Sequence, residues 1–260
     1  MGLNLPVRHN AKLKLLQERI DADEELQQIW RCANINAVDR LAMSDHGNVH
    51  IRIVSNAALR LLRLLLEAEI KPSLEVNYGA LELGSEDAEV VVVLASCLHD
   101  LGISVHRDDH ELYSLALAPA KIKELLEGMY TIPQRAVIQS ETLHAIVAHQ
   151  WEVTCLTLEA GVVKVADALD MTQGRSRITF QSGDTNIHSV SAAAIDAVNL
   201  VRGEAKPIRV EIRMSNSAGI FQVDELLKRK LHHSSIAQHV EVVAHIETET
   251  EKSLVQLYKL

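Results

Sequence analysis

The sequence predicts a mainly α-helical protein with a small α/β domain at its C-terminal end. Apolar residues make up 47% of the 260 residues, but aromatic residues make up only 3%, so the core must be built from Leu, Ile, Val and Ala. Over the first two-thirds of the chain these residues recur at the spacing of amphipathic helices. Near Gly174 the pattern changes and includes segments that alternate with period two. We therefore expect a helical domain over residues 1–175 and an α/β domain over residues 176–260, the latter serving oligomerisation or capping the substrate.

Apolar spacing and chain breakers predict the helices of the first domain in order. Lys71-Pro72 and Gly102 are expected to end helices, and Asp108-Asp109 is expected to cap the start of one. A loop is expected over residues 79–87, and Gly161 is a soft point within the last helix. The predicted helices cover residues 10–42 (one or two helices), 49–70, 88–101, 110–126, 136–149 and 156–170.

The second domain is predicted from a different pattern. Residues 207–214 alternate between apolar and polar side chains, as a half-buried strand does. Residues 190–201 and 221–231 are expected to form helices. Further strands are expected over residues 177–180, 240–246 and 253–258.

Composition limits the functions that the chain can have. The formal net charge of −9 disfavours bulk nucleic-acid binding, although a small phosphate ester can still bind in a pocket lined by metal ions. Three widely spaced cysteines provide neither a disulfide framework nor a zinc ribbon. The N-terminus lacks the apolar core of a signal peptide, and the longest apolar runs are too short to span a bilayer. These features predict a cytoplasmic protein with no membrane partner.

The most informative motif is the pair His99-Asp100. It follows the apolar run of residues 90–98 and precedes Leu101-Gly102, so an imidazole and a carboxylate lie at the end of a buried segment. Burying both groups is costly unless something neutralises them, and a metal ion accepts imidazole nitrogen and carboxylate oxygen together. Further candidate ligands flank the pair on both sides: His50, His110, His149 and Asp167.

The ordered set H…HD…H…H…D, over about residues 40–177, resembles the HD superfamily of metal-dependent phosphohydrolases. The resemblance implies an HD-type helical bundle with one or two divalent metal ions, and the segments around His110 and His149 favour two. Mn²⁺ or Fe²⁺ suits this ligand chemistry best, with Mg²⁺, Co²⁺, Ni²⁺ and Zn²⁺ as alternatives. The resemblance also implies that Asp100 bridges two metals and that hydroxide generated from water attacks phosphorus. The implied metal ligands are His50, His99, Asp100, His110, His149 and Asp167.

Three further residues are candidates for catalysis or substrate binding. The spacing of His46 and His50 resembles the HNxxH signature of cyclic-nucleotide phosphodiesterases, which implies that His46 is a general acid; the alternative is a polar loop residue. Arg175 lies in a segment that resembles the one whose arginine faces the substrate phosphate in relatives. Arg107 lies beside the HD loop and is the second candidate, and either arginine could equally be a surface residue.

The substrate class is a small phosphorylated molecule, a phosphomonoester, phosphodiester or nucleotide. The chain lacks the lysine that often follows HD in relatives and the acidic pair of the stringent-response branch. The alternative is a non-catalytic sensing or assembly module on the same fold that binds a metal or nucleotide. In that case Val210, Ile212 and Leu226-Leu227 would form a homo-oligomer interface. A helical scaffold with coincidental histidines is a third reading, but seven of the thirteen histidines fall between residues 46 and 149.

Overall fold

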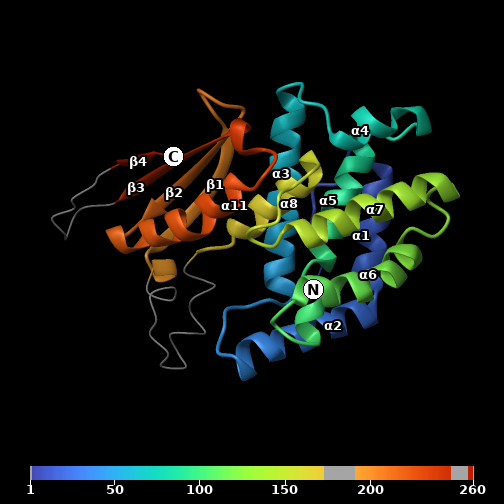
Figure 1. Ribbon diagram of the computed structural model, residues 1–260, viewed down its shortest axis with the longest axis horizontal. Helices are drawn as coiled ribbons and strands as arrows, with labels where there is room; N and C mark the ends of the chain where they lie inside the picture. The colour runs from blue at the N-terminus through green and yellow to red at the C-terminus, as the bar shows by residue number, and fades with distance from the viewer. Residues whose placement is uncertain (1, 173–190, 247–256, 260) are drawn as a thin grey trace.

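The computed structural model describes residues 2–172, 191–246 and 257–259. A bundle of helices forms the N-terminal part, and a small sheet with helical segments beside it forms the C-terminal part (Figure 1). The predicted mainly α architecture with a small α/β domain is therefore confirmed. The boundary predicted at residues 175–176 lies outside the described residues and stays a prediction.

The helices of the bundle follow the predicted order. Ser73–Tyr78 is a short helix that the apolar pattern did not predict. Residues 35–40 continue the second helix as a π-helical turn. The helices are α1 (Ala11–Ala22), α2 (Glu24–Asn34), α3 (Asn48–Glu67), α4 (Ser73–Tyr78), α5 (Ser85–Leu98), α6 (His110–Leu125), α7 (Ile132–Ala148) and α8 (Leu158–Ala168).

Helix α5 lies at the centre of the bundle, in contact with α1, α3, α7 and α8. All of its residues from Asp87 to Leu98 are buried, which explains why this helix is apolar around its whole circumference. The indole N–H of Trp30, on α2, donates a hydrogen bond of 2.8 Å to the carbonyl oxygen of Cys97 near the end of α5. The core thus fixes the position at which His99-Asp100 follows.

A tight contact with α6 holds the turn that contains His99-Asp100. The backbone N–H of Gly102 donates to Ser114 Oγ at 2.8 Å, and Ser114 Oγ donates to the carbonyl oxygen of His99 at 2.6 Å. A Cβ atom on Gly102 would lie 2.0 Å from the carbonyl oxygen of His110. Gly102 does not end α5 as predicted, because α5 ends at Leu98 and Gly102 lies in the 3₁₀ turn Leu101–Ser104. It is instead needed for close packing of α6 against this turn.

The prediction that an aspartate side chain caps the start of α6 is wrong. Asp109 stands at the N-cap position, but its φ is 57° and its side chain makes no capping hydrogen bond. Asp109 instead provides a left-handed turn that leads the chain into α6.

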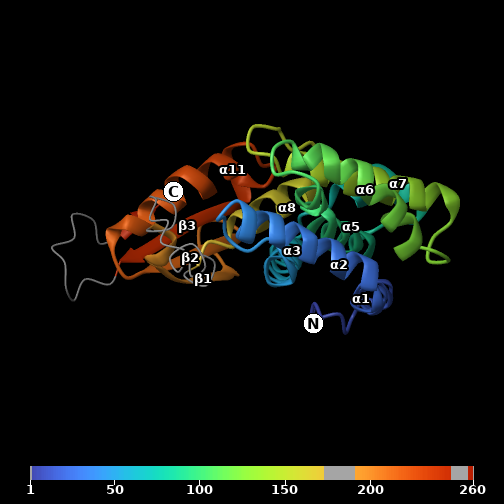
Figure 2. The ribbon, with the colours of Figure 1, turned by 90° about the horizontal axis from the view of Figure 1, so that it is seen from below.

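The C-terminal part contains a four-stranded sheet in the order β1-β2-β3-β4. Strands β2 and β3 are parallel, and β1–β2 and β3–β4 are antiparallel. Residues 222–228 and α11 (Arg229–His232) make the crossover between β2 and β3 and lie along the sheet (Figures 1 and 2). The strands are β1 (Ile195–Arg202), β2 (Ile208–Met214), β3 (Val240–Ile246) and β4 (Leu257–Lys259).

The helix predicted over residues 190–201 is wrong from residue 195 on, because residues 195–202 form strand β1. Residues 191–193, in the alanine-rich stretch before the strand, are helical as predicted. Seven residues of β1 pair with β2, and Ile195 is fully buried. Pairing with β2 therefore decides where the helical segment ends. The strand predicted over residues 177–180 lies outside the described residues. Most of the strand predicted over residues 253–258 does too, but its last two residues belong to β4.

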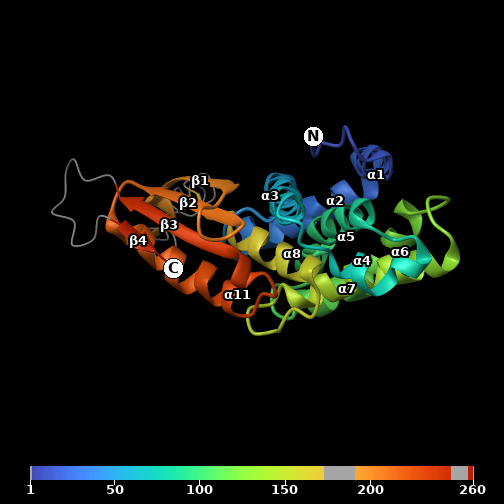
Figure 3. The same ribbon diagram turned by 90° about the horizontal axis from the view of Figure 1, so that it is seen from above.

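The two parts of the chain are packed closely where α11 lies beside α8 (Figure 3). The carbonyl oxygen of His233 accepts a hydrogen bond of 3.0 Å from the backbone N–H of Cys155. Ser235 Oγ donates to the carbonyl oxygen of Thr157 at 2.7 Å. A Cβ atom on Gly161 would lie 2.2 Å from Ser235 Oγ, so this glycine allows the close approach.

The side chains of Val210, Ile212 and Leu227 are fully buried within the chain. A second copy cannot contact these three side chains, and of the four predicted interface residues Leu226 alone is partly exposed. Among the described residues, no helix combines the length and the apolar character needed to cross a membrane. The three cysteines are free thiols, as their spacing predicts.

Candidate metal centre

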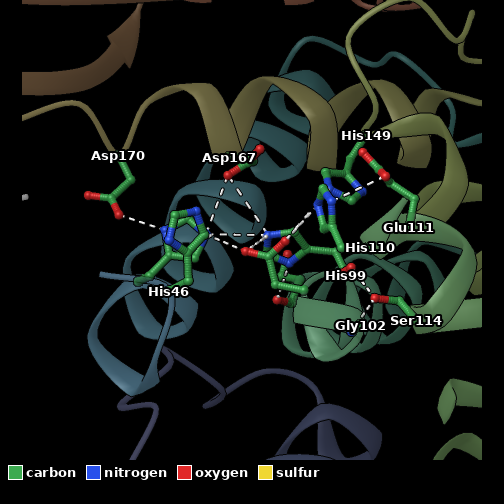
Figure 4. A network of polar contacts seen from close by, with 12 residues as sticks. His46, His99, Gly102, His110, Glu111, Ser114, His149, Asp167 and Asp170 are labelled. Carbon is green, nitrogen blue, oxygen red and sulfur yellow. Dashed lines mark hydrogen bonds and ion pairs between the residues drawn. The ribbon is translucent and has the colours of Figure 1, made fainter. Parts of the chain in front are cut away.

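The structure brings the six predicted metal ligands together at the junction of five helices (Figure 4). His50 lies in the first turn of α3, and His99-Asp100 follows the end of α5. His110 begins α6, His149 follows α7, and Asp167 lies in the last turn of α8. Helix ends therefore supply nearly all of the polar groups, so the bundle can place them in its interior without interrupting the apolar core.

Four atoms from these residues form a first ligand set. His50 Nε2 lies 3.3 Å from His99 Nε2, 3.4 Å from Asp100 Oδ2 and 3.4 Å from Asp167 Oδ1. His99 Nε2 lies 3.3 Å from Asp100 Oδ2 and 3.8 Å from Asp167 Oδ1. Two imidazole nitrogens and two carboxylate oxygens thus face one common point.

The other oxygen of Asp100 faces a second set. Asp100 Oδ1 lies 3.2 Å from His110 Nε2 and 3.8 Å from His149 Nε2, and these two nitrogens lie 3.2 Å apart. Asp100 is therefore shared between the two sets, with one carboxylate oxygen in each.

The outer nitrogens of the histidines indicate which ring atoms carry protons. In three of them Nδ1 faces an acceptor oxygen: Asp170 Oδ2 for His50 (2.7 Å), the carbonyl oxygen of Ser96 for His99 (2.9 Å) and that of Ile146 for His149 (2.5 Å). A proton held on Nδ1 leaves the Nε2 lone pair directed at the cluster. Converging lone pairs and carboxylates repel each other, and a bound cation removes that repulsion.

The spacing of the ligand atoms also fits a metal ion. Atoms bound at about 2.1 Å to one ion lie about 3.0 Å apart at neighbouring octahedral positions and about 3.4 Å apart at tetrahedral positions. The separations of 3.2–3.8 Å in the two sets are in this range or slightly above it. Mixed imidazole and carboxylate ligands suit first-row divalent ions.

Charge in the cluster favours metal binding. Burial alone raises the pKa of Asp100, but the neighbouring His99, His110 and His50 together hold its pKa well below the ordinary value. Burial also opposes ionisation of Asp167, and Lys230 is the main group that lowers its pKa, again well below the ordinary value. Burial holds the pKa of His149 well below its usual range. The carboxylates are therefore ionised and His149 is neutral near pH 7, which are the forms that bind a metal.

The remaining predicted residues lie around the cluster in different ways. His46 is buried, its ring centre lies 5.3 Å from that of His50, and its Nδ1 lies 2.7 Å from the carbonyl oxygen of Ser44. Arg107 Nη1 lies 2.6 Å from Nδ1 of His110, on the side of the ring away from Asp100. Arg175 lies outside the described residues.

Two residues support the cluster in ways that the motif did not predict. Asp170, three residues after Asp167, contacts Nδ1 of His50 (Figure 4). Lys230 was missed altogether, although it contacts Asp167. A signal was present in the sequence: Val223, Leu227 and Lys230 recur at helical spacing, which places a lysine on the apolar face of the predicted helix.

This geometry defines a class of protein, a helical bundle with a buried histidine and aspartate centre suited to divalent metals. The family model of the HD domain matches residues 58–172. The chain is also 40% identical over 236 residues to an uncharacterized protein of Methanocaldococcus jannaschii, MJ1020, with 91% of this chain and 90% of that protein covered. The chain belongs to the HD domain superfamily. His50 lies before the matched range, so its place in the cluster depends on the structure.

Proposed function

We propose that the protein is a metal-dependent phosphohydrolase that uses two divalent metal ions to cleave a phosphomonoester, a phosphodiester or a nucleotide. The observation that carries this proposal is the position of Asp100, whose two oxygens face separate ligand sets. A carboxylate shared in this way suits a two-metal site for phosphoester hydrolysis. HD domain membership supports the same reaction class.

The metal ions, when bound, lower the pKa of a coordinated water towards neutrality and polarise a phosphoryl oxygen. In this proposal the first site consists of His50, His99, Asp100 and Asp167, and the second of Asp100, His110 and His149. Mn²⁺ or Fe²⁺ is the expected metal, because both bind imidazole nitrogen and carboxylate oxygen.

The chain's own residues hold the ligands and move a proton. Asp170 orients His50 through Nδ1. The contact of His46 Nδ1 with the carbonyl oxygen of Ser44 keeps a proton on Nδ1. In the protonated imidazolium, Nε2 then gives its proton to the leaving oxygen, and the ring becomes neutral with Nδ1 still protonated. Arg175 remains a proposed contact of the substrate phosphate. Arg107 remains the second proposed contact of the substrate phosphate. Metal binding through Nε2 of His110 needs a proton on Nδ1, for which the carbonyl oxygen of Arg107 at 3.1 Å is the acceptor. The guanidinium of Arg107 can only donate, so it cannot be the partner of Nδ1 in that form.

Hydrolysis by metal-loaded protein tests this function. A panel of phosphomonoesters, phosphodiesters and nucleotides is incubated with the Mn²⁺-loaded protein, and metal content is measured on the same samples. We expect hydrolysis by the parent and none by Asp100→Ala. The exposed Asp108→Ala is the matched control and should keep full activity. Metal-loaded protein that binds nucleotides but hydrolyses no member of the panel would instead support a sensing module.

Location and partners are part of the proposal. We propose a cytoplasmic protein whose partner is a small phosphorylated substrate rather than nucleic acid or a membrane, in agreement with the net charge of −9. A homo-oligomer formed through the C-terminal domain is also proposed, on surfaces other than Val210, Ile212 and Leu227. Size-exclusion chromatography with light scattering tests it, and a strict monomer would contradict it.

A further inference from the structure

The ammonium group of Lys230, a residue in the C-terminal part of the chain, lies at the metal centre. Its Nζ donates a hydrogen bond to Asp167 Oδ2, and its side chain is only 8% exposed. The other oxygen of Asp167 faces His50 and His99. The ammonium group therefore lies at the edge of the first ligand set, separated from it by one carboxylate.

The fold holds Lys230 firmly in this position. Lys230 lies in α11, and the chain that follows is fixed to the start of α8 by hydrogen bonds from Cys155 N–H to His233 and from Ser235 Oγ to Thr157. Ser234 Oγ adds a third contact, to the carbonyl oxygen of Gly161 at 3.3 Å. These contacts hold the helix that carries Lys230 against the helix that carries Asp167.

The ammonium group retains donors that the described residues do not use. An ammonium has three N–H donors, and in the described part of the chain Asp167 is the acceptor of its hydrogen bond. The ring centre of Trp151 lies 6.0 Å from Nζ, at the limit of a cation–π contact. Two donors are therefore unused by the described part of the chain.

Lys230 also lies near the chain segment that carries His149 of the second set. Its Nζ is 6.0 Å from the ring centre of Trp151, which follows His149 by two residues. The ammonium group therefore lies beside Asp167 of the first set and close to the segment that supplies a ligand of the second.

We propose that Lys230 binds a phosphate oxygen of the substrate, so that the C-terminal part of the chain completes the active site. The proposal rests on the proposed phosphohydrolase function. A lysine ammonium serves as a point charge for phosphate, and this one has donors that the described residues do not use. The alternative is that Lys230 only compensates the charge of Asp167 and positions it.

Binding of inorganic phosphate to the Mn²⁺-loaded protein separates these roles. The variants are Lys230→Met, which keeps the length of the side chain without its charge, and Lys230→Arg, which keeps the charge. Lys228→Met is the matched control, because Lys228 lies on the same helical segment with a half-exposed side chain. Phosphate affinity is measured by isothermal titration calorimetry, Mn²⁺ content by mass spectrometry, and KM and kcat on the best substrate of the panel.

We expect Lys230→Met to keep the parent's Mn²⁺ content and to weaken phosphate binding about 10- to 100-fold, the usual effect of losing a charge-assisted hydrogen bond. KM should rise, Lys230→Arg should restore part of the affinity, and Lys228→Met should match the parent. Unchanged phosphate affinity in Lys230→Met overturns the proposal. Loss of Mn²⁺ from that variant also overturns it, because Lys230 would then position Asp167.

The same measurements distinguish failure of the Lys230 proposal from failure of the proposed phosphohydrolase function. If the parent hydrolyses no phosphoester but its phosphate affinity still depends on Lys230, the phosphate site stands and the proposed hydrolysis is overturned. If the parent hydrolyses the panel and Lys230→Met has the same phosphate affinity and KM, the function stands and the role of Lys230 is overturned.

Discussion

The carboxylate of Asp170 lies 2.7 Å from Nδ1 of His50, across 120 positions of the sequence. Both groups are buried, and the contact leaves Nε2 of His50 facing His99, Asp100 and Asp167. A carboxylate behind a ligand histidine fixes the orientation of its ring and raises its basicity as a ligand. Asp170 therefore belongs to the metal centre although it does not face the metal position.

Removing the Asp170 carboxylate should weaken metal binding at the first ligand set. We expect Asp170→Ala to lower the Mn²⁺ affinity about 10- to 100-fold, because His50 loses the group that orients it. Competition with a fluorescent chelator measures this affinity. Asp39→Ala, at an exposed position, is the control. An unchanged affinity in Asp170→Ala would show that His50 needs no such support.

Replacing His46 should slow hydrolysis without removing metal. We expect His46→Asn to lower kcat about 10²- to 10⁴-fold for substrates with a poor leaving group, the usual range for a lost general acid. The loss should be much smaller for p-nitrophenyl phosphate esters, whose leaving group needs no proton. The exposed His9→Asn serves as control. Equal losses for both kinds of substrate would remove His46 as the proton donor.

A methyl group on Gly102 should displace α6 from the HD turn. Its Cβ would lie 2.0 Å from the carbonyl oxygen of His110 and 2.7 Å from the backbone nitrogen of Ser114, so the backbone must shift. We expect Gly102→Ala to lower the free energy of unfolding by about 2–3 kcal/mol and to weaken metal binding at the second set. Urea denaturation and Mn²⁺ stoichiometry measure the two effects.

Gly79→Ala is the matched control for this prediction. No atom lies within 4 Å of the Cβ position of Gly79, and its φ of −57° suits alanine. Its stability should equal or slightly exceed that of the parent. If Gly102→Ala behaved in the same way, the turn would have room that the structure does not show.

Two buried carboxyl groups away from the metal centre should make stability depend on pH. Burial is the main cause that raises the pKa of both Glu141 and Glu159, and each has one oxygen without a hydrogen-bond partner among the described residues. A raised pKa in the folded state means that the folded state holds its proton more tightly than the unfolded state does. Stability is then greatest below the ordinary pKa of 4.5 and falls as the pH rises through the folded pKa.

Replacing the carboxyl of Glu159 by an amide removes that dependence. We expect Glu159→Gln to raise the free energy of unfolding by about 1 kcal/mol near pH 8 and to have little effect near pH 4. Glutamine keeps an acceptor for the backbone N–H of Leu74, which Glu159 now binds at 2.9 Å. Urea denaturation at the two pH values measures the difference. Equal effects at both would show that ionisation of Glu159 is not the cause.

The sequence alone predicted the mainly helical bundle, the small α/β part and the order of the candidate ligands. It could do so because helical spacing of apolar residues reflects burial on one face, and because His99-Asp100 at the end of a buried run requires compensation. The prediction failed at β1, where residues 195–202 pair with β2 although the alanine-rich stretch just before them is helical at residues 191–193. Local propensity is worth less than the hydrogen bonds and burial that a neighbouring strand supplies.

Only the tertiary structure decided how the polar groups meet. The sequence gives no distances, so it could not show that the two oxygens of Asp100 face different ligand sets or that Asp170 lies behind His50. The contact between Lys230 and Asp167 could not be predicted from the sequence either, because it depends on how α11 packs against α8. Residue types and their order fix which groups must be buried, and the packing of helices and sheet determines which of them share one point in space.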